Sequence, residues 1–433
     1  MFKKPIWVIL TTLIALTFII GACGPAVTDE PPDDDKPFAG ETVTIFTAAG
    51  EEQMEVFRRN FIDFQERTGI IIEVEGSPDF ETLAVVRSEA GDPYDILNFP
   101  QPGLMADMAR DGYLVDLGEF ISDAEVKAHY TQSWIDLGTV DGKLVGVWHG
   151  ADVKSLVWYP KAAFEAAGYT IPETWDELIA LSEQILADGT APWCIGIESG
   201  GATGWPGTDW VEDIMLRTTS PENYDRWVAG ELLFNSPEVR NAFEIMGEIW
   251  FRDGFVLGGT TGILTTGFGD APLPMFDDPP SCFLHRQASF IPNFFPEGAR
   301  VGVDVDYFYL PPIDMQYGKP VLGSGNLISL AKDSPAAREV VKFMITAESV
   351  RAEVEAGNVV APHLDADLSW YPDDITRGFA EILMAADTFR FDASDLMPGV
   401  VGAGSFWDGI VNFVSGDDLD AVLTTIDASW PGR

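Results

Sequence analysis

Positive charge is scarce in this sequence. Its 433 residues include 26 lysines and arginines against 69 aspartates and glutamates, which gives a formal net charge of −43. Because the acidic residues run along the whole chain, the phosphate backbone of a nucleic acid and an anionic membrane surface would both be repelled. We therefore expect no nucleic-acid partner. A strongly hydrated surface explains most of these carboxylates, and a salt-rich or acidic habitat would also fit.

Signatures of common catalytic and metal sites are also missing. The sequence contains no Gly-x-Ser-x-Gly, no His-Glu-x-x-His and no nucleotide-binding glycine loop. Its three cysteines, Cys23, Cys194 and Cys282, do not follow the spacing of a zinc site. We expect neither a metal nor another cofactor. One enzyme class stays open, because the paired carboxylates of a glycoside hydrolase could lie anywhere among 69 acidic residues.

The N-terminal segment indicates export from the cytoplasm. Two lysines precede an uncharged apolar run from Ile6 to Ile20, which is shorter than the roughly 20 residues that span a bilayer and suits a signal peptide. The run ends in Ile-Gly-Ala-Cys23, which resembles the lipobox of bacterial lipoproteins. We predict a signal peptide over residues 1–22 and a lipidated, acidic, proline-rich tether over residues 23–40. The alternative is a secreted protein with a chance cysteine at its cleavage site.

The remaining two cysteines are expected to pair. If Cys23 carries lipid, Cys194 and Cys282 are left, and an even number of cysteines outside the cell favours a disulfide. The alternative is two unpaired, buried thiols.

The body of the chain begins as an α/β protein. With 46% apolar and 12% aromatic residues it is globular, and it is long enough for two domains. Residues 42–47 alternate like a strand, residues 51–67 follow a helical stripe that Gly69 ends, and residues 70–74 form a second strand. This is the βαβ unit of a parallel sheet, and residues 94–99 supply a third strand.

Ligands of parallel sheets bind at the carboxyl ends of the strands. The first such end is the loop that contains Gly50 and Glu51, and another follows the third strand at Phe99 and Gln101. We predict that these four residues contact a ligand.

A glycine-rich segment from Ser199 to Trp210 is predicted to be a loop, because four glycines and a proline interrupt regular structure. It carries Trp205 and Asp209. An indole surrounded by small polar side chains suits a sugar, which has apolar C–H faces and hydroxyl edges. Trp407 follows a similar glycine-rich approach. The alternative is that the indoles fill a core beneath the loops.

Residues 142–159 form an extended segment with a glycine in its middle, which could cross between two lobes. Trp148 and His149 are candidates for ligand contact there, although a histidine satisfied at a sheet edge is an equal alternative. Asp152 and Lys154 lie two apart on a strand and share a face. They either pair with each other or reach into a cleft.

Two further candidates lie in the second half of the chain. The Arg286 guanidinium could donate a fork of two hydrogen bonds to a hydroxylated ligand, or it could form an ordinary salt bridge. The run Gly323-Ser324-Gly325 permits close approach of a ligand to the backbone, but it lacks the glycine pattern and the strand-to-helix setting of a phosphate loop.

Several motifs together resemble an extracellular solute-binding protein of a carbohydrate ABC transporter, within the group of α-glucoside and maltose-binding-protein-like members. They are the lipobox, the βαβ start, the run Lys154 to Tyr159, Gly204-Trp205-Pro206, and Gly404-Ser405-Phe406-Trp407. The resemblance implies a two-lobed α/β fold of the type II periplasmic-binding-protein class. Each lobe is a mixed sheet flanked by helices, and the ligand cleft lies between the lobes. The implied lobes are residues 41–149 with 305–345, and residues 150–304 with 346–433.

The resemblance also implies a function. A di- or oligosaccharide, expected to be an α-glucoside, is bound by lobe closure and delivered to the transmembrane subunits of an ABC permease. The binding protein would be a monomer without enzymatic activity, held at the outer face of the membrane by lipid on Cys23. Trp205 and Trp407 match the stacking aromatics, and Ala49-Gly50-Glu51 matches the polar contacts of the first lobe. The rivals are a surface-anchored glycoside hydrolase and a sugar-recognition or sensor lipoprotein without transport.

Overall fold

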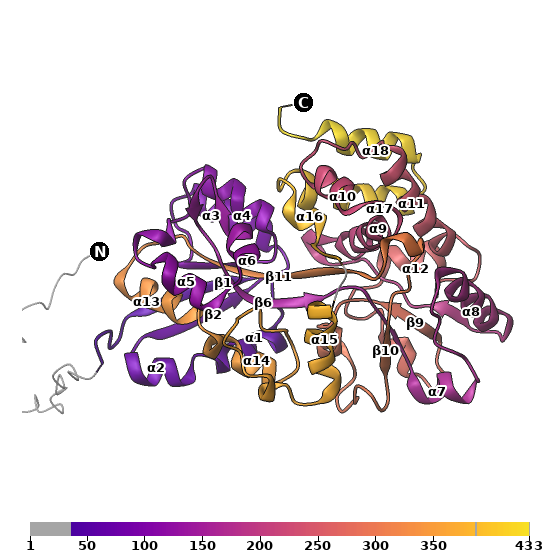
Figure 1. The fold of residues 1–433 in the computed structure, drawn as a ribbon, viewed down its shortest axis with the longest axis horizontal. Coiled ribbons are helices and arrows are strands. Elements are labelled where there is room, and N and C mark those ends of the chain that lie inside the picture. Colours follow the sequence, from indigo (N-terminus) through magenta and orange to yellow (C-terminus); the bar gives the residue numbers. More distant parts are fainter. Residues whose placement is uncertain (1–35, 386–387, 433) are drawn as a thin grey trace, which may run out of the picture.

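The computed structural model describes residues 36–385 and 388–432. The predicted signal peptide, Cys23 and most of the predicted tether lie outside these residues. None of the described helices is both long enough and apolar enough to cross a membrane. Figure 1 shows two α/β lobes joined by extended strands, which confirms the predicted two-lobed architecture.

The first lobe is built on a six-stranded sheet of order β12-β11-β3-β1-β2, in which β6 also pairs with β11. Strand β1 runs parallel to both β2 and β3. The strands of this lobe are β1 (Thr42–Thr47), β2 (Ile71–Gly76) and β3 (Ile96–Phe99), with a small hairpin of β4 (Thr139–Val140) and β5 (Lys143–Leu144). Its helices are α1 (Glu51–Arg59), α2 (Ile62–Thr68), α3 (Phe80–Glu89), α4 (Pro102–Arg110), α5 (Asp123–His129), α6 (Gln132–Leu137) and α13 (Pro335–Met344).

The predicted βαβ unit is present, with one difference. The helical stripe expected over residues 51–67 is split near Asn60 into α1 and α2, and its phenylalanines all point into the core of this lobe. Phe64 stacks on Phe343 of α13 with ring centroids 4.6 Å apart. Gly69 ends α2 at φ 79°, a left-handed conformation that glycine adopts without strain.

Two antiparallel strands connect the lobes, β6 (Val147–Val153) and β11 (Pro320–Leu330). The carboxyl half of β11 pairs with β3, whereas its first four residues pair with β12 (Thr388–Phe391). The register between β6 and β11 shifts at Asn326 and Leu327. All seven residues of β6 are buried, because this strand runs through the middle of the molecule (Figure 1). The extended segment predicted to cross between the lobes therefore does so.

The second lobe contains a four-stranded sheet of order β10-β7-β9-β8. Its strands are β7 (Leu156–Tyr159), β8 (Ala191–Trp193), β9 (Cys282–Arg286) and β10 (Asp306–Tyr309). Its helices are α7 (Lys161–Ala166), α8 (Trp175–Ala187), α9 (Trp205–Thr218), α10 (Pro221–Val228), α11 (Pro237–Trp250), α12 (Gly259–Thr265), α16 (Ala393–Leu396), α17 (Trp407–Ser415) and α18 (Leu419–Ala428). A third apolar cluster under the connecting strands includes Phe379 of α15 (Asp374–Ala385).

Two segments pack differently from the implied lobe boundaries. Residues 305–345 were expected in the first lobe, but β10 pairs antiparallel with β7 in the second sheet, so the chain returns to the first lobe through β11. Residues 346–433 were expected in the second lobe, but α14 (Arg351–Glu355) packs against α1 of the first. Asn60 fixes that contact, because its Nδ2 donates to Glu353 Oε2 at 2.7 Å.

Candidate ligand-binding site

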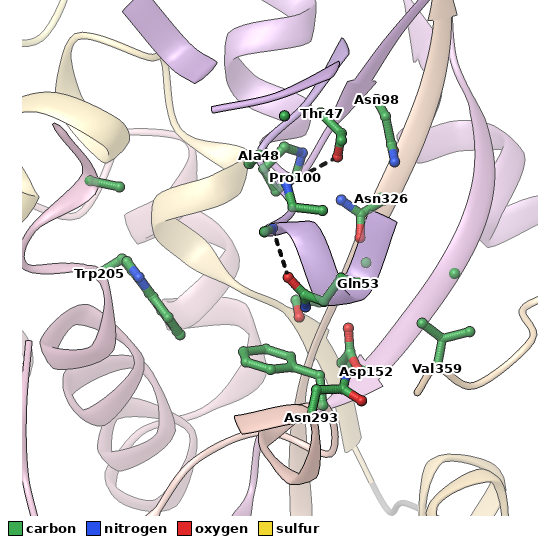
Figure 2. A pocket seen from close by; sticks show the side chains of 18 of the residues that line it. Thr47, Ala48, Gln53, Asn98, Pro100, Asp152, Trp205, Asn293, Asn326 and Val359 are labelled. Carbon is green, nitrogen blue, oxygen red and sulfur yellow. Dashed lines mark hydrogen bonds between the residues drawn. The ribbon is translucent and has the colours of Figure 1, made fainter. Parts of the chain in front are cut away.

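A cavity of about 640 Å³ lies between the lobes (Figure 2). Both lobes and the two connecting strands contribute to its walls. Pockets of this size and enclosure are typical of sites for small organic ligands.

The first-lobe wall is formed by the carboxyl ends of three parallel strands, as the sequence predicted. Thr47 ends β1, Gly76 ends β2 and Asn98 lies near the end of β3, and the strand register places all three side by side. The loop after β1 is held by its own side chains. Thr47 Oγ1 accepts the Ala49 N–H at 3.2 Å, and Gln53 Oε1 accepts the Gly50 N–H at 3.1 Å (Figure 2). This loop is therefore a preformed polar surface.

The second-lobe wall is aromatic. Trp205 projects toward the first-lobe side chains in Figure 2, with its ring centroid 5.0 Å from that of Phe268 and 6.1 Å from that of Phe290. Trp407 begins α17 and also lines the cavity, although only 3% of it is exposed. Gly204 allows the two segments to meet, since its φ is 114° and a Cβ there would lie 2.4 Å from the Trp407 carbonyl oxygen.

The predicted loop over residues 199–210 is shorter in the structure. Helix α9 begins at Trp205, with Pro206 in its first turn, where the missing N–H costs nothing. Asp209 consequently lies inside a helix and is fully buried, rather than presented by a loop. Its carboxylate contacts a cation in the link between β6 and β7.

That cation is Lys154, the centre of a buried ionic network. Its Nζ lies 2.7 Å from Asp209 Oδ1 and also bonds to Asp392 Oδ2. The ammonium is 5.2 Å from the centroid of the Trp205 ring, a cation–π distance. Behind it, Arg286 bonds to Asp209 at 3.2 Å and to Asp213 at 2.7 Å. The network ties the link between β6 and β7 to α9, to β9 and to the residues that follow β12.

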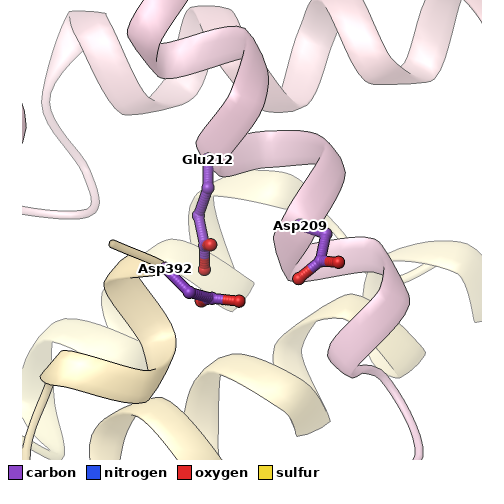
Figure 3. A group of neighbouring side chains, drawn as sticks. All are labelled: Asp209, Glu212 and Asp392. Carbon is purple, nitrogen blue, oxygen red and sulfur yellow. The ribbon is translucent and has the colours of Figure 1, made fainter. Parts of the chain in front are cut away.

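Carboxylates outnumber cations in this network (Figure 3). Burial opposes ionisation of Asp392, but the Lys154 ammonium outweighs it and lowers the pKa of Asp392. Burial, reinforced by the negative charge of Asp392, raises the pKa of Glu212 and of Asp395 well above the usual range. This shift favours the neutral form of both groups.

The same cluster has the composition of a cation site. Carboxylate oxygens of Asp209, Glu212 and Asp392 lie within 4.8 Å of one another. The Lys154 ammonium bonds to two of these three residues, so it supplies the positive charge that an ion would otherwise bring.

Two polar side chains of β6 face the cavity where the strands cross. His149 Nε2 lies 2.6 Å from Glu353 Oε2, and its ring meets Phe57 edge-on at 5.0 Å. Asp152 accepts the Ser289 hydroxyl at 3.1 Å. Burial raises the pKa of Asp152 to about 7, despite the opposing effect of that hydrogen bond and of Lys154.

Replacing Asp152 by asparagine is expected to stabilise the protein at pH 8 by roughly 1–3 kcal/mol, because it removes a buried charge. The folded state of the wild type binds more protons than the unfolded state between about pH 4 and pH 7, so the stability that this group contributes falls as pH rises. The difference in unfolding free energy between the wild type and Asp152→Asn should therefore vanish near pH 4. Urea unfolding at both pH values measures it, with the exposed Asp417→Asn as control. Equal stabilisation at both pH values would contradict the argument.

Most of the residues predicted to contact a ligand do line the cavity. They are Gly50, Glu51, Gln101, His149, Asp152, Lys154, Trp205, Ser324 and Trp407.

The other five predicted contacts do not line the cavity, and their expected role is corrected to a structural one. Phe99 packs edge-on against Phe80 in the first core, and Trp148 packs against Trp134 and Phe391. Gly323 is covered by the Phe389 ring. Asp209 and Arg286 lie behind Lys154 and hold it in place.

Sequence reasoning missed several lining residues, among them Asn98, Glu81, Phe290, Asn293, Asn326, Glu353 and Asp395. One of them carried a signal. Asn98 is the single polar residue of the otherwise apolar strand Ile-Leu-Asn-Phe, and it faces the side of the sheet opposite to Phe99. The others come from segments far apart in the sequence that only the fold brings together.

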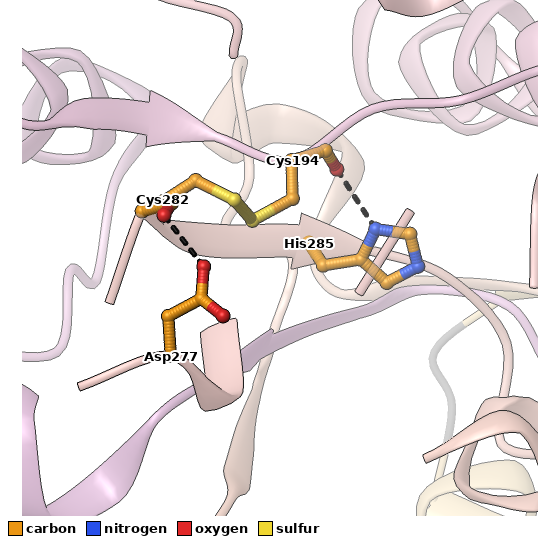
Figure 4. The surroundings of a disulfide bond; sticks show 5 residues. Cys194, Asp277, Cys282 and His285 are labelled. Atoms are coloured by element: carbon orange, nitrogen blue, oxygen red, sulfur yellow. Dashed lines mark hydrogen bonds between the residues drawn. A yellow bond between two sulfur atoms is a disulfide. The ribbon is translucent and has the colours of Figure 1, made fainter. Parts of the chain in front are cut away.

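A disulfide lies behind the second-lobe wall (Figure 4). Cys194 follows β8 and Cys282 begins β9, and the structure joins them across neighbouring strands with Cα atoms 5.6 Å apart. This is the pairing expected from the cysteine count. His285 Nδ1 lies 2.8 Å from the Cys194 carbonyl oxygen, and burial lowers the pKa of His285 to about 4.

The model of the bacterial extracellular solute-binding protein family matches residues 41–351. The chain belongs to this family. This solute-binding protein is 46% identical to the osmoprotective compounds-binding protein GgtB of Synechocystis sp., over 98% of the present chain and 99% of the relative. It is 44% identical to the alpha-glucosides-binding periplasmic protein AglE of Rhizobium meliloti, over 90% and 87% of the two chains.

The fold is similar to that of a chitin oligosaccharide binding protein, with a TM-score of 0.76 and 17% identity over 89% of this solute-binding protein and 97% of the neighbour. At that identity the likeness concerns the fold alone. It confirms the predicted type II arrangement of two lobes with a cleft between them.

Proposed function

We propose that this solute-binding protein is the sugar-binding component of an ABC importer, and that its ligand is an α-glucoside or a closely related glycoside. The observation that carries the proposal is the cavity between the lobes, in which Trp205 and Trp407 line one wall and polar loops line the other. A pyranose has apolar C–H faces that stack on indoles and hydroxyl edges that bond to amides and carboxylates. The name of one relative, the alpha-glucosides-binding periplasmic protein AglE, supports this ligand class.

The binding energy must come from both walls. Each indole face adds about 0.5–1.5 kcal/mol beyond the burial of apolar area, whereas micromolar affinity requires roughly −8 kcal/mol. Hydrogen bonds to the sugar hydroxyls therefore supply much of the rest. Because the two walls belong to different lobes, a sugar binds the closed form better than an open one and shifts the population toward it. The closed form is what the permease would recognise, at a membrane to which Cys23 anchors the chain.

Calorimetric titration of the purified protein with maltose, trehalose, sucrose and glucose tests this proposal, with chromatography of the sugars afterwards. We expect saturable binding of an intact disaccharide. Cleavage of any sugar would instead make the protein a hydrolase, and the absence of binding by all four would overturn the ligand assignment.

Trp205→Ala is expected to weaken disaccharide binding by about tenfold or more, since it removes a stacking face without removing a core residue. Trp370→Ala is the matched control, because this indole lies outside the cavity. Circular dichroism checks that both variants are folded. Unchanged affinity in Trp205→Ala would remove this wall from the site.

A further inference from the structure

The charges that line the cavity are almost all negative. The lining carboxylates are Glu51, Glu81, Asp152, Glu353, Asp392 and Asp395. Among the described residues, Lys154 is the only lysine or arginine in the lining, and its ammonium is already bonded to Asp209 and Asp392. A ligand therefore meets carboxylates without a free cation.

Three of these carboxylates have no lysine or arginine as an ion-pair partner in the described part of the chain. Glu81 on α3 accepts only an amide N–H, from Gln101 Nε2 at 2.9 Å. Asp152 on β6 accepts only the Ser289 hydroxyl. Asp395 on α16 is affected by the negative charges of Asp392 and Glu81, both of which raise its pKa. They belong to the first lobe, the connecting strand and the second lobe, so every part of the site presents a carboxyl group to the ligand. At pH 8 Asp152 carries a negative charge, since its pKa is about 7. Burial and the negative charge of Asp392 hold the pKa of Asp395 well above the usual range, so Asp395 contributes least to this charge.

Such a lining needs hydrogen-bond donors from its ligand. Hydroxyl and ammonium groups donate, whereas a phosphate or a carboxylate only accepts and adds a like charge in a poorly solvated space. We propose that the cavity selects glycosides by charge, accepting neutral and amino-substituted ones and rejecting those that carry a phosphate or a carboxylate. This inference rests on the proposed function and narrows its ligand class.

Titration with maltose, trehalose and sucrose, each beside its 6-phosphate, tests the selection at pH 8. For any parent sugar that binds, we expect the phosphate to bind about 100-fold more weakly or worse, given the cost of juxtaposed like charges. The 6-O-acetyl ester of the same sugar controls for size and should lose less than about tenfold. A sugar 6-phosphate that binds as tightly as the 6-O-acetyl ester of the same sugar would overturn the inference and leave the proposed function standing. If none of the neutral sugars binds, the proposed function fails.

Charge-neutralising variants identify the carboxyl groups that are responsible for rejecting the phosphate. The double variant Glu81→Gln with Asp152→Asn should narrow the affinity ratio between parent and phosphate by about tenfold or more at pH 8. The matched control, Asp63→Asn with Glu66→Gln on the exposed face of α2, makes the same change in net charge away from the cavity and should leave the ratio unaltered. If the cavity double variant leaves the affinity ratio between parent sugar and phosphate unchanged, these carboxyl groups are not the ones that reject the phosphate.

Fluorescence quenching tests the negative charge of the cavity without any sugar. The Trp205 contribution is the difference between the wild type and Trp205→Phe. Relative to free N-acetyltryptophanamide, this contribution should be quenched more strongly by caesium than by iodide at pH 8, and the preference should fall in the Glu81→Gln, Asp152→Asn background but not in the α2 control. A cavity that admits iodide as readily as caesium would overturn the inference even if no sugar binds.

Discussion

Replacing Lys154 by methionine is expected to destabilise the folded protein by about 3–5 kcal/mol, the usual cost of removing one partner from a buried ion pair. Methionine keeps the length and the apolar stem of the side chain but removes the ammonium. Asp392 would then lose its cation and Asp209 would keep only Arg286, with Glu212 beside them in a buried environment that solvates charge poorly. Urea unfolding followed by circular dichroism measures the loss.

The pH dependence distinguishes lost charge from lost packing. In the wild type the lowered pKa of Asp392 contributes stability above the unfolded-state pKa, and this contribution is lost as pH falls. That loss begins only below about pH 4, the pKa of an unfolded aspartate, so the wild type keeps the contribution at pH 4.5. In Lys154→Met the buried carboxylates lack the cation that favours their charged forms, and they take up protons as pH falls. The difference in unfolding free energy between the wild type and Lys154→Met should therefore be smaller at pH 4.5 than at pH 8. The control is Lys143→Met, which removes the same charge from an exposed position. A gap that does not change with pH would mean that the ammonium is not what stabilises this cluster.

Removing the disulfide by the double variant Cys194→Ala with Cys282→Ala is expected to cost about 4 kcal/mol, from the entropy of closing a loop of this length. The two cysteines are 88 residues apart and both are buried. The loop between them contains α9 to α12 and therefore the whole Trp205 segment.

Denaturant unfolding under oxidising conditions measures this cost, and thiol titration of the denatured wild type checks the bond itself. The wild type should show no free thiol at residues 194 and 282, and reductant should lower its stability to that of the double variant. Two titratable thiols, or an equal unfolding midpoint in the two proteins, would contradict the pairing.

Local signals in the sequence were sufficient for individual elements. Thr174, a favourable N-cap residue with Glu177 three positions later, predicts a helix over Trp175 to Ala187. Helix α8 has these bounds, and the Thr174 hydroxyl accepts the Glu177 N–H at 3.3 Å. Such signals succeed because a cap, an apolar stripe and a stop residue are all decided within a few residues.

The candidate site was harder to predict where two neighbouring residues compete for one role. Every residue of β6 is buried, so alternation along the strand offers no exposed face by which to choose between Trp148 and His149. The fold decides, sending the indole of Trp148 into the first core and the imidazole of His149 to the cavity. Likewise, the sequence around Asp209 does not show that this residue pairs with both Lys154 and Arg286. Those partners lie 55 and 77 positions away along the chain.

The pairing of β11 with β3 has a consequence for how the chain is made. Strand β3 is complete by residue 99, but its partner on one side is supplied by residues 327–330. While the first two thirds of the chain emerge from the ribosome, the first sheet has an open edge and the cleft has only one finished wall. A chain that stops before residue 327 therefore completes neither the first sheet nor the cleft. The first lobe can finish folding only after most of the second lobe has been synthesised.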